Sequence, residues 1–246
     1  MNKVEQFIKY ACEFVPDYRE RIRGASLAEI ETFEQLVGVP FPQIYKDYLL
    51  RLGYDNGGLE IVGDYSDITV LIEYYEEFML PYGEVSDDTI VIGEDMIVGS
   101  FVLHCIPSKE PAVFNGEPNN LGSLYSESFE KLLFRSVFTV CQHRRFPYVV
   151  SLMNDDYRPL LKPLAEVVII LGYTPLWFSD SVAFCAEKPE STIYAIQAEG
   201  GRGITISVAT ALAGLLMDQI LSIIINKLEL DEKTLIKNID KCKNYR

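Results

Sequence analysis

Residues 26–58 read SLAEIETFEQLVGVPFPQIYKDYLLRLGYDNGG, and their pattern predicts two short helices and a turn. Ser26 and Glu29 have the spacing of a capping box, in which each side chain binds the backbone N–H of the other residue. Apolar residues then recur at helical spacing up to Gly38, a residue type that ends helices because it tolerates a left-handed backbone. The first helix should therefore lie between Ser26 and Gly38.

The second predicted helix begins at a proline and ends at a glycine. Pro42 suits the first turn of a helix, where a missing N–H costs no hydrogen bond. Apolar residues follow at helical spacing as far as Gly53. Residues 55–58 (DNGG) tolerate positive φ, so they should form a turn that leads into a short strand over residues 59–62.

The order of these pieces resembles the signature of the SUKH superfamily, which includes the Smi–Knr family of fungal regulators and many bacterial immunity proteins. The motifs that carry the resemblance are Ile30-Glu31-Thr32-Phe33-Glu34, Gly38-Val39-Pro40, the aromatic-rich segment 45–52, Asn56-Gly57-Gly58, the strand-like Ile92-Gly93-Glu94-Asp95 and the helical Phe129-Glu130-Lys131-Leu132-Leu133. The resemblance covers residues 4–140. The chain departs from the family pattern at Gly99-Ser100-Phe101, where the family usually has a Gly-Asp pair.

The resemblance implies a non-enzymatic protein that binds another protein. Bacterial members of this kind are immunity proteins that neutralise a toxin domain, often a nuclease, delivered by a neighbouring cell. The fungal members suggest an alternative, a regulatory scaffold that binds an endogenous protein with the same surface. A toxin gene beside the gene for this chain would favour the immunity protein.

Acidic residues are concentrated in the first part of the chain. The formal net charge is −14, and residues 1–145 hold 24 acidic and 12 basic residues, a net charge of −12. No Lys or Arg occurs between Arg51 and Lys109, in a window that holds Asp55, Glu60, Asp64, Asp67, Glu73, Glu76, Glu77, Glu84, Asp87, Asp88, Glu94 and Asp95. This composition disfavours direct binding of nucleic acid, which needs a Lys/Arg footprint. The window is either a solvated acidic face or a landing surface for a cationic protein.

Tyrosines interleave with these acids, a combination that indicates a protein-binding surface. Tyrosine supplies contact area at a low entropy cost, and carboxylates attract a basic partner. Some of the tyrosines must belong to the core. We expect the contact surface for a basic toxin domain to include Asp55, Asp64, Asp67, Glu73, Tyr74, Glu76 and Glu77.

The succession of periodic segments predicts an α+β protein of two domains. Residues 1–145 should form a SUKH-like domain, with N-terminal helices packed on a mostly antiparallel sheet. Residues 146–246 should form a second α+β domain, with a helix over 158–171, an antiparallel meander between 174 and 208 and a following helix. Residues 227–246 should form an amphipathic tail helix.

The sequence contains no nucleophile-elbow, phosphate-binding or EF-hand motif. Its two histidines, His104 and His143, form no HxxxH or HExxH pattern, and its five cysteines include no CxxC pair. We therefore expect no enzyme activity, no cofactor and no metal; catalysis by Cys105 with His104, or by Cys141 with His143, is the alternative. The scattered cysteines favour a reducing cytoplasm.

Two apolar features of the second half of the chain, the stretch 204–225 and Trp177, each have two interpretations. Asp218 interrupts the apolar stretch 204–225 before it is long enough to span a membrane, so a strand followed by a buried helix is favoured over a membrane segment. The single tryptophan, Trp177, has apolar neighbours and is expected in the core; an exposed anchor in a binding surface is the alternative.

Overall fold

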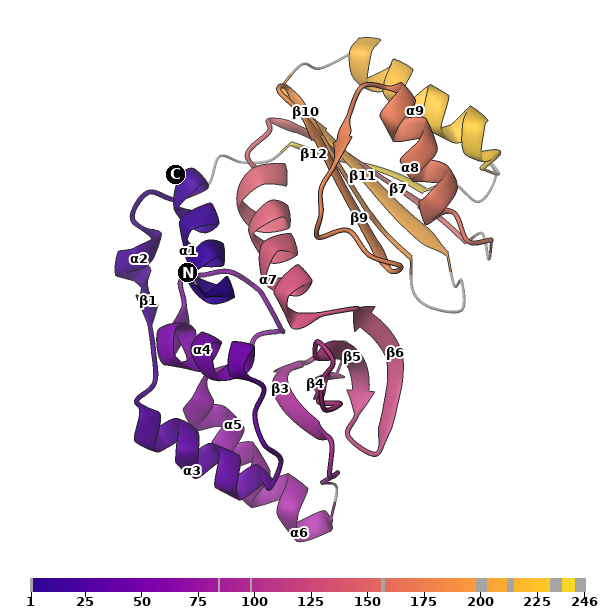
Figure 1. Ribbon diagram of the computed structural model, residues 1–246. Coiled ribbons are helices and arrows are strands. Elements are labelled where there is room, and N and C mark those ends of the chain that lie inside the picture. Colours follow the sequence, from indigo (N-terminus) through magenta and orange to yellow (C-terminus); the bar gives the residue numbers. More distant parts are fainter. Residues whose placement is uncertain are drawn as a thin grey trace. The chain divides into compact units, whose positions relative to one another are not determined.

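The computed structural model describes residues 2–83, 85–97, 99–155, 158–197, 203–211, 215–230 and 236–241 (Figure 1). The chain is an α+β protein, as predicted, and its described strand pairs are antiparallel. It divides into two compact units, Met1–Ser136 and Val137–Arg246. The predicted division lies after Arg145, whereas the units divide within the helical stretch 129–143.

The first unit begins with a series of helices. They are α1 (Lys3–Phe14), α2 (Tyr18–Arg21), α3 (Leu27–Val37), α4 (Gln43–Leu52), α5 (Ile68–Tyr74), the π-helical turn η1 (Tyr75–Met79) and α6 (Leu80–Tyr82). Helix α7 (Phe129–Val137) follows the sheet, and its continuation, the π-helical η2 (Phe138–His143), belongs to the second unit. Ser26 and Glu29 form the predicted capping box, and Gly38 ends α3 with a φ of 76°. Pro42 precedes the first turn of α4 and does not lie within it.

The sheet of the first unit is a four-stranded meander in the order β3-β4-β5-β6. Its strands are β3 (Thr89–Asp95), β4 (Gly99–His104), β5 (Ala112–Glu117) and β6 (Asn120–Ser126), and a separate ribbon pairs β1 (Ile22–Arg23) with β2 (Asp55–Asn56). The composition of residues 115–121 (NGEPNNL) is typical of a loop. Those residues instead form the hairpin between β5 and β6.

The expected strand over residues 59–62 is wrong. Gly57 and Gly58 form the expected turn with positive φ, but the segment after it packs as irregular, mostly buried chain against β3. The carbonyl oxygen of Val62 would lie 2.0 Å from a Cβ atom on Gly93. Only glycine fits at position 93 because the two backbones approach each other so closely.

The second unit is built on a six-stranded sheet in the order β12-β7-β11-β10-β9-β8. Its strands are β7 (Tyr148–Asn154), β8 (Thr174–Pro175), β9 (Ala183–Lys188), β10 (Ser191–Ile196), β11 (Ile204–Thr210) and β12 (Ile236–Lys241). Helices α8 (Leu161–Ile170) and α9 (Leu215–Leu228) cover one face of the sheet (Figure 1). Alternate strand residues pack against these helices in a core that includes Leu164, Val168, Ile193, Ile206, Val208, Leu221 and Ile224.

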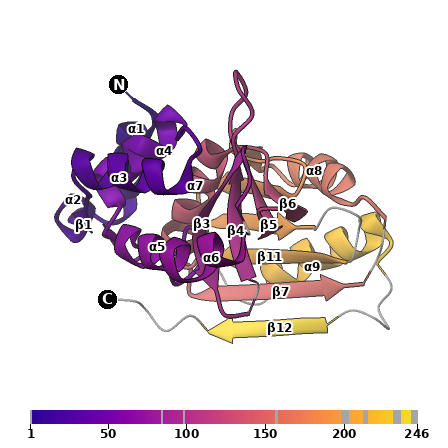
Figure 2. The ribbon, with the colours of Figure 1, turned by 90° about the horizontal axis from the view of Figure 1, so that it is seen from below.

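The predicted tail helix over residues 227–246 is wrong. Helix α9 ends at Leu228, and Glu229 adopts a left-handed φ of 51° that stops it. Strand β12 then pairs with β7 at the edge of the sheet (Figure 2). The backbone hydrogen bonds to β7 outweigh the helical spacing of the apolar residues. Residues 231–235 and 242–246 of the tail lie outside the described residues.

Trp177 lies at the surface of the second unit, so the prediction of a core position is wrong. Its side chain is 56% exposed, whereas the neighbouring Phe178 is buried. The Phe178 ring contacts Phe138 at 5.9 Å between centroids. Phe178 thus takes the inward position of this aromatic pair.

Candidate functional site

One helical stretch carries most of the predicted contact residues. α5, η1 and α6 follow one another over residues 68–82, and we name this stretch the acidic helix. Asp67 caps its N-terminus by accepting the backbone N–H of Thr69 at 2.7 Å. Pro81 does not stop the helix as its position would suggest, because it lies in the first turn of α6, where no N–H is required. The stretch ends at Gly83, with a φ of 68°.

Helical spacing divides the acidic helix into a buried face and an exposed face. The side chains that enter the core are Ile68, Leu71, Tyr75 and Met79. Beside them, at i, i+4 spacing, runs a partly exposed stripe of Val70, Tyr74, Phe78 and Tyr82. The exposed carboxylates on the solvent side of this stripe are Glu73, Glu76 and Glu77. The acidic helix therefore presents aromatic and acidic side chains together.

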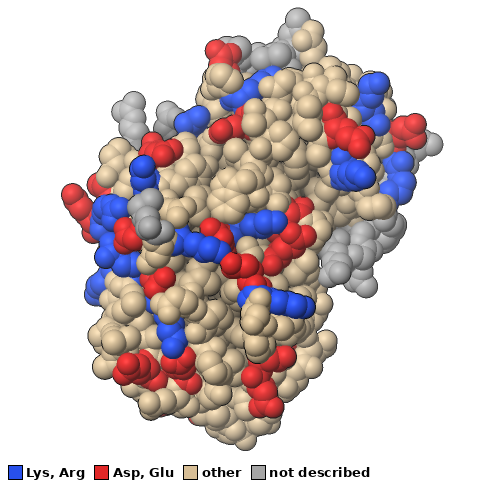
Figure 3. Space-filling model, viewed as in Figure 1, with Lys and Arg blue, Asp and Glu red and all other residues tan. Residues whose placement is uncertain are grey.

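These carboxylates form no ion pair within the described ranges of the chain. None of Glu73, Glu76 and Glu77 forms an ion pair with a described Lys or Arg. Basic side chains of the first unit are engaged elsewhere: Lys3 with Glu110 and Glu130, Arg19 and Arg51 with Glu5, Arg21 with Asp17, Lys46 with Glu34, and Lys131 with Glu127. Figure 3 shows acidic side chains, and few basic ones, over the end of the unit formed by α3 and α6. The negative field of the acidic helix thus remains available to a partner.

Tyr74 connects the acidic helix to the sheet. Its hydroxyl hydrogen-bonds with Glu94 of β3 and Ser100 of β4, and Ser100 donates its own hydroxyl to Glu94. Burial and the Glu94 carboxylate raise the pKa of Tyr74 to about 12, so its phenol stays protonated at neutral pH. The Tyr74 ring also contacts Phe78, at 5.7 Å between centroids. Tyr74 therefore contacts the sheet through its hydroxyl and Phe78 through its ring.

The other predicted contact residues do not all join this surface. Asp64 is exposed and precedes Tyr65, whose backbone pairs with Glu94 at the end of β3. Asp55 lies apart, in β2 opposite Arg23 of β1. The structure thus groups Glu73, Tyr74, Glu76 and Glu77 on the acidic helix, with Asp67 at its start and Asp64 beside the end of β3. Glu84 of the same window lies outside the described residues.

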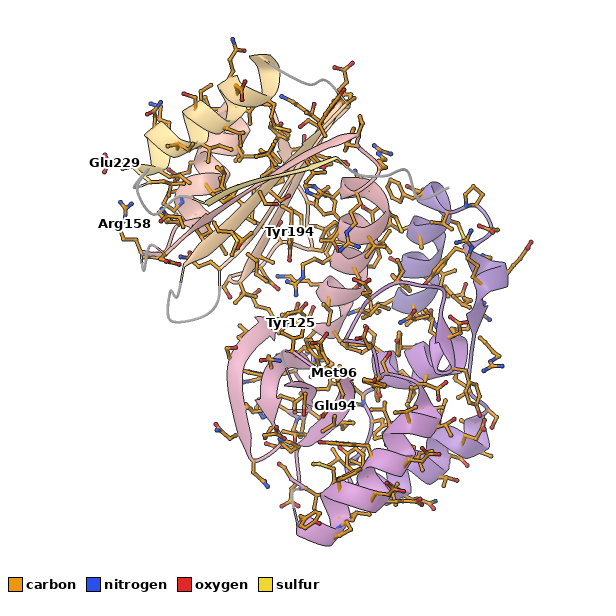
Figure 4. All side chains as sticks on the ribbon, turned by 180° about the vertical axis from the view of Figure 1, so that it is seen from behind. Glu94, Met96, Tyr125, Arg158, Tyr194 and Glu229 are labelled. Carbon is orange, nitrogen blue, oxygen red and sulfur yellow. The ribbon has the colours of Figure 1, made fainter. Side chains whose placement is uncertain are left out.

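Exposed apolar residues that the sequence did not predict border these acids. The turn between β3 and β4 holds Met96 and Ile97, which are 83% and 93% exposed. Figure 4 shows Met96 next to Glu94, and the Tyr65 hydroxyl lies 3.9 Å from the Met96 sulfur. No clear signal for them exists in the sequence, because Ile97 fits the β-branched and apolar run of the following strand.

The Cys105–His104 pair is not arranged for catalysis. His104 Nε2 lies 3.2 Å from Asp88 Oδ2, and the Cys105 thiol is directed to the carbonyl of Leu103. Burial, together with the negative charge of Asp88, raises the pKa of Cys105 to about 12. A thiol with this pKa is a poor nucleophile at neutral pH because almost none of it is ionised.

His143 is buried on the face of the second sheet opposite α8 and α9. Its Nδ1 and Nε2 atoms each lie 2.9 Å from a hydroxyl oxygen, of Thr192 and Ser207 respectively. Burial, and secondarily the charge of Arg144, lowers the pKa of His143 to about 4. Both ring nitrogens are thus occupied by hydroxyl groups and neither serves as a base for Cys141.

The described part of the chain contains neither a cluster of metal ligands nor a membrane-spanning helix. No group of three or more His, Cys, Asp or Glu side chains within it could hold a metal ion. Within the same ranges, no helix has both the length and the apolar character needed to cross a membrane. The acidic helix is the candidate site because it presents exposed carboxylates and aromatic side chains together.

Comparison of the chain with protein-family models gave no match, and no curated protein is significantly similar to it.

Proposed function

We propose that the chain is a non-enzymatic immunity protein of the SUKH type, which binds and neutralises a cationic toxin domain, most simply a nuclease. The observation that carries the proposal is the acidic helix, where carboxylates without a described basic partner lie beside exposed aromatic side chains. The motifs of the first unit support the family, and the tight fit of Val62 against Gly93 explains the glycine of its strand motif.

The electrostatics of the acidic helix suit a nuclease as partner. Nucleases carry clustered Lys and Arg because they hold phosphate groups. Exposed carboxylates attract such a domain over a distance and raise the rate of productive encounters. Phe78 and Tyr82 then provide apolar contact area, the type of side chain that dominates binding energy in protein interfaces. The charges would thus set the association rate and the aromatic side chains the dissociation rate.

The proposal places the protein in the cytoplasm, where a delivered nuclease would reach its substrate. Cysteine usage is consistent with that location, since Cys12 and Cys105 are free thiols. The geometry around Cys105 and His143 supports a binding role over catalysis, because neither side chain is activated.

The test is a binding titration between the purified chain and the toxin domain encoded beside its gene, at low and at high ionic strength. We expect tight binding that weakens roughly tenfold or more at high salt, because salt screens exposed charges. Failure to bind any neighbouring toxin domain would refute the immunity function, and binding that is insensitive to salt would refute the role of the acidic helix. Binding to an endogenous protein alone would favour the regulatory scaffold.

A further inference from the structure

The sequence contains two Asn-Gly pairs, Asn56-Gly57 and Asn115-Gly116. An asparagine that precedes glycine can lose its side-chain amide, because the next backbone nitrogen attacks the side-chain carbonyl carbon and glycine has no side chain to obstruct the attack. The product is a cyclic succinimide, which water opens to aspartate or to isoaspartate. The contacts of each pair decide whether the folded chain promotes this reaction.

The Asn56 side chain folds back along the backbone that follows it. Asn56 Oδ1 accepts the backbone N–H of Gly58 at 3.1 Å, which is the hydrogen bond of an Asx turn. Because this bond spans Gly57, it holds the side-chain carbonyl group beside the peptide that contains the Gly57 nitrogen. The Gly58 N–H also stabilises the negative charge that develops on Oδ1 when the carbon is attacked, as the donors of an oxyanion hole do.

The Asp55 carboxylate contacts the attacking nitrogen. Asp55 Oδ1 accepts the backbone N–H of Gly57 at 2.9 Å. A carboxylate at this distance from an N–H is placed to take its proton as a general base. Asp55 is exposed, and Asn56 and Gly57 are partly exposed, so water has access to a succinimide formed there. The turn thus places an electrophile, a nucleophile, a base and an oxyanion donor in four consecutive residues.

The second Asn-Gly pair is held differently. Asn115 lies within β5, opposite Phe101 of β4 and Ser123 of β6. Its side-chain Nδ2 donates to the carbonyl oxygen of Ser100 at 3.4 Å, which directs the amide toward β4. The side-chain amide is therefore turned toward a neighbouring strand and away from the nitrogen of Gly116.

We infer that Asn56 is a site of spontaneous modification, at which the folded chain converts asparagine through a succinimide to aspartate or isoaspartate. The Gly57 nitrogen forms a bond to Cγ of Asn56 while Asp55 takes the N–H proton. The bond between Cγ and Nδ2 then breaks, and the side-chain nitrogen leaves as ammonia with the proton that Asp55 returns. Water adds to the side-chain carbonyl carbon to give aspartate, or to the backbone carbonyl carbon to give isoaspartate.

The modification changes the β1–β2 ribbon. Both products carry a carboxylate in place of the amide, which adds one negative charge beside Asp55. Isoaspartate also routes the backbone through the former side chain of Asn56. That residue pairs with Ile22, and its backbone carbonyl oxygen accepts the Tyr18 hydroxyl at 2.8 Å. Isoaspartate at position 56 therefore displaces both contacts.

The first experiment compares the two Asn-Gly pairs in the purified chain, folded and unfolded in guanidinium chloride, during incubation at neutral pH. Mass spectrometry of peptides measures the loss of each amide, and cleavage by hydroxylamine identifies the succinimide. We expect Asn56 to react roughly tenfold or more faster than Asn115 in the folded chain, and the two rates to agree within about threefold in the unfolded chain. A ratio of rates that is no higher in the folded chain would overturn the inference.

The second experiment tests the base. Asp55→Asn keeps the size of the side chain and an oxygen that accepts the Gly57 N–H, but this oxygen does not take the proton. We expect Asn56 to react roughly tenfold more slowly in this variant, with the rate at Asn115 in the same molecule unchanged. The matched control Asp87→Asn removes another exposed carboxylate of the first unit and should change neither rate.

An unchanged rate at Asn56 in Asp55→Asn would overturn the assignment of Asp55 as the base. If that variant fails to fold, the comparison of folded and unfolded wild-type chain decides whether the fold promotes the reaction.

Discussion

The fold holds His143 in its neutral form. Its ring nitrogens bind the hydroxyls of Thr192 and Ser207, and the Ser207 hydroxyl also accepts that of Ser151. Hydroxyl groups satisfy a neutral imidazole, since one can donate to it and the other accept from it. A buried imidazolium here would have the charge of Arg144 nearby, which opposes protonation.

The first prediction concerns the stability of the protein in acid. The pKa of His143 falls from about 6.5 in the unfolded chain to about 4 in the fold, so the unfolded state binds the proton more readily. The free energy of unfolding should therefore be unaffected by His143 above pH 6.5 and should fall by about 3 kcal/mol between pH 6.5 and 4. Chemical denaturation across this pH range measures the effect, and His143→Gln should remove this part of the slope.

The control for this prediction is the other histidine of the chain. His104→Gln should keep the slope that His143 causes, because His104 is partly exposed and pairs with Asp88 outside the second unit. A decrease in the free energy of unfolding of His143→Gln that is the same at every pH would report only the hydrogen bonds that the variant lacks. An unchanged slope in that variant would contradict the account of the buried imidazole.

Residue type alone does not predict which aromatic and apolar side chains lie at the surface and which lie in the core. Trp177 and Phe178 are adjacent in sequence, yet only Phe178 is buried. Tyr74 and Tyr75 are adjacent, and the helical stripe sends Tyr75 into the core and Tyr74 to the edge of the sheet. Which of two neighbours turns inward depends on the helix register and on the packing partner, neither of which composition specifies.

Strand β3 is an edge strand, and two tyrosines contact the side of it that pairs with no other strand of the sheet. The Tyr75 hydroxyl accepts the backbone N–H of Val91 at 2.8 Å, in a buried position. Tyr65 pairs with Glu94 farther along the strand. Edge strands with unpaired backbone groups invite association with other chains, and these contacts occupy that edge.

The second prediction follows from the contact between η1 and β3. Tyr75→Phe should lower the free energy of unfolding by about 1–3 kcal/mol, because the buried N–H of Val91 loses its acceptor. Urea denaturation measures the change. The matched control Tyr65→Phe removes an exposed hydroxyl whose described contact is a weak one to sulfur, and it should cost less than about 0.5 kcal/mol. Equal losses in the two variants would show that the η1–β3 contact is not the source of the effect.

Elements with a strong local pattern could be predicted from the sequence. α1, α3 and α4 follow from apolar periodicity and capping residues, and β9, β10 and β11 follow from turn residues between apolar runs. β7 and β12 could not be predicted in this way, because their strand conformation comes from pairing with each other and with the distant β11. The apolar spacing before and within β12 also fits a helix, which led to the wrong tail prediction.

The net negative charge of the molecule belongs to its first unit. Residues 1–136 hold 24 acidic and 10 basic residues, a net charge of −14, while residues 137–246 hold 12 of each. The sequence indicated this asymmetry, and the observed division sharpens it by assigning Arg144 and Arg145 to the second unit. The sequence could not show that Asp55 lies opposite Arg23 while the acids of the acidic helix have no described basic partner. That distinction depends on which segments the fold brings together.

The proposed function requires that a local surface, and not net charge alone, recognises the partner. Two triple variants of equal charge separate these possibilities. Glu73→Gln/Glu76→Gln/Glu77→Gln neutralises the acidic helix. The control, Glu13→Gln/Glu20→Gln/Glu31→Gln, neutralises three exposed carboxylates of α1, α2 and α3.

The most direct measurement is the association rate constant of each variant with the toxin domain encoded beside the gene, at low ionic strength. We expect the acidic-helix variant to associate roughly tenfold more slowly than the wild type and the control variant to stay within about twofold of it. Equal rates for the two variants, whether slowed or unchanged, would contradict the claim that the acidic helix is the binding surface.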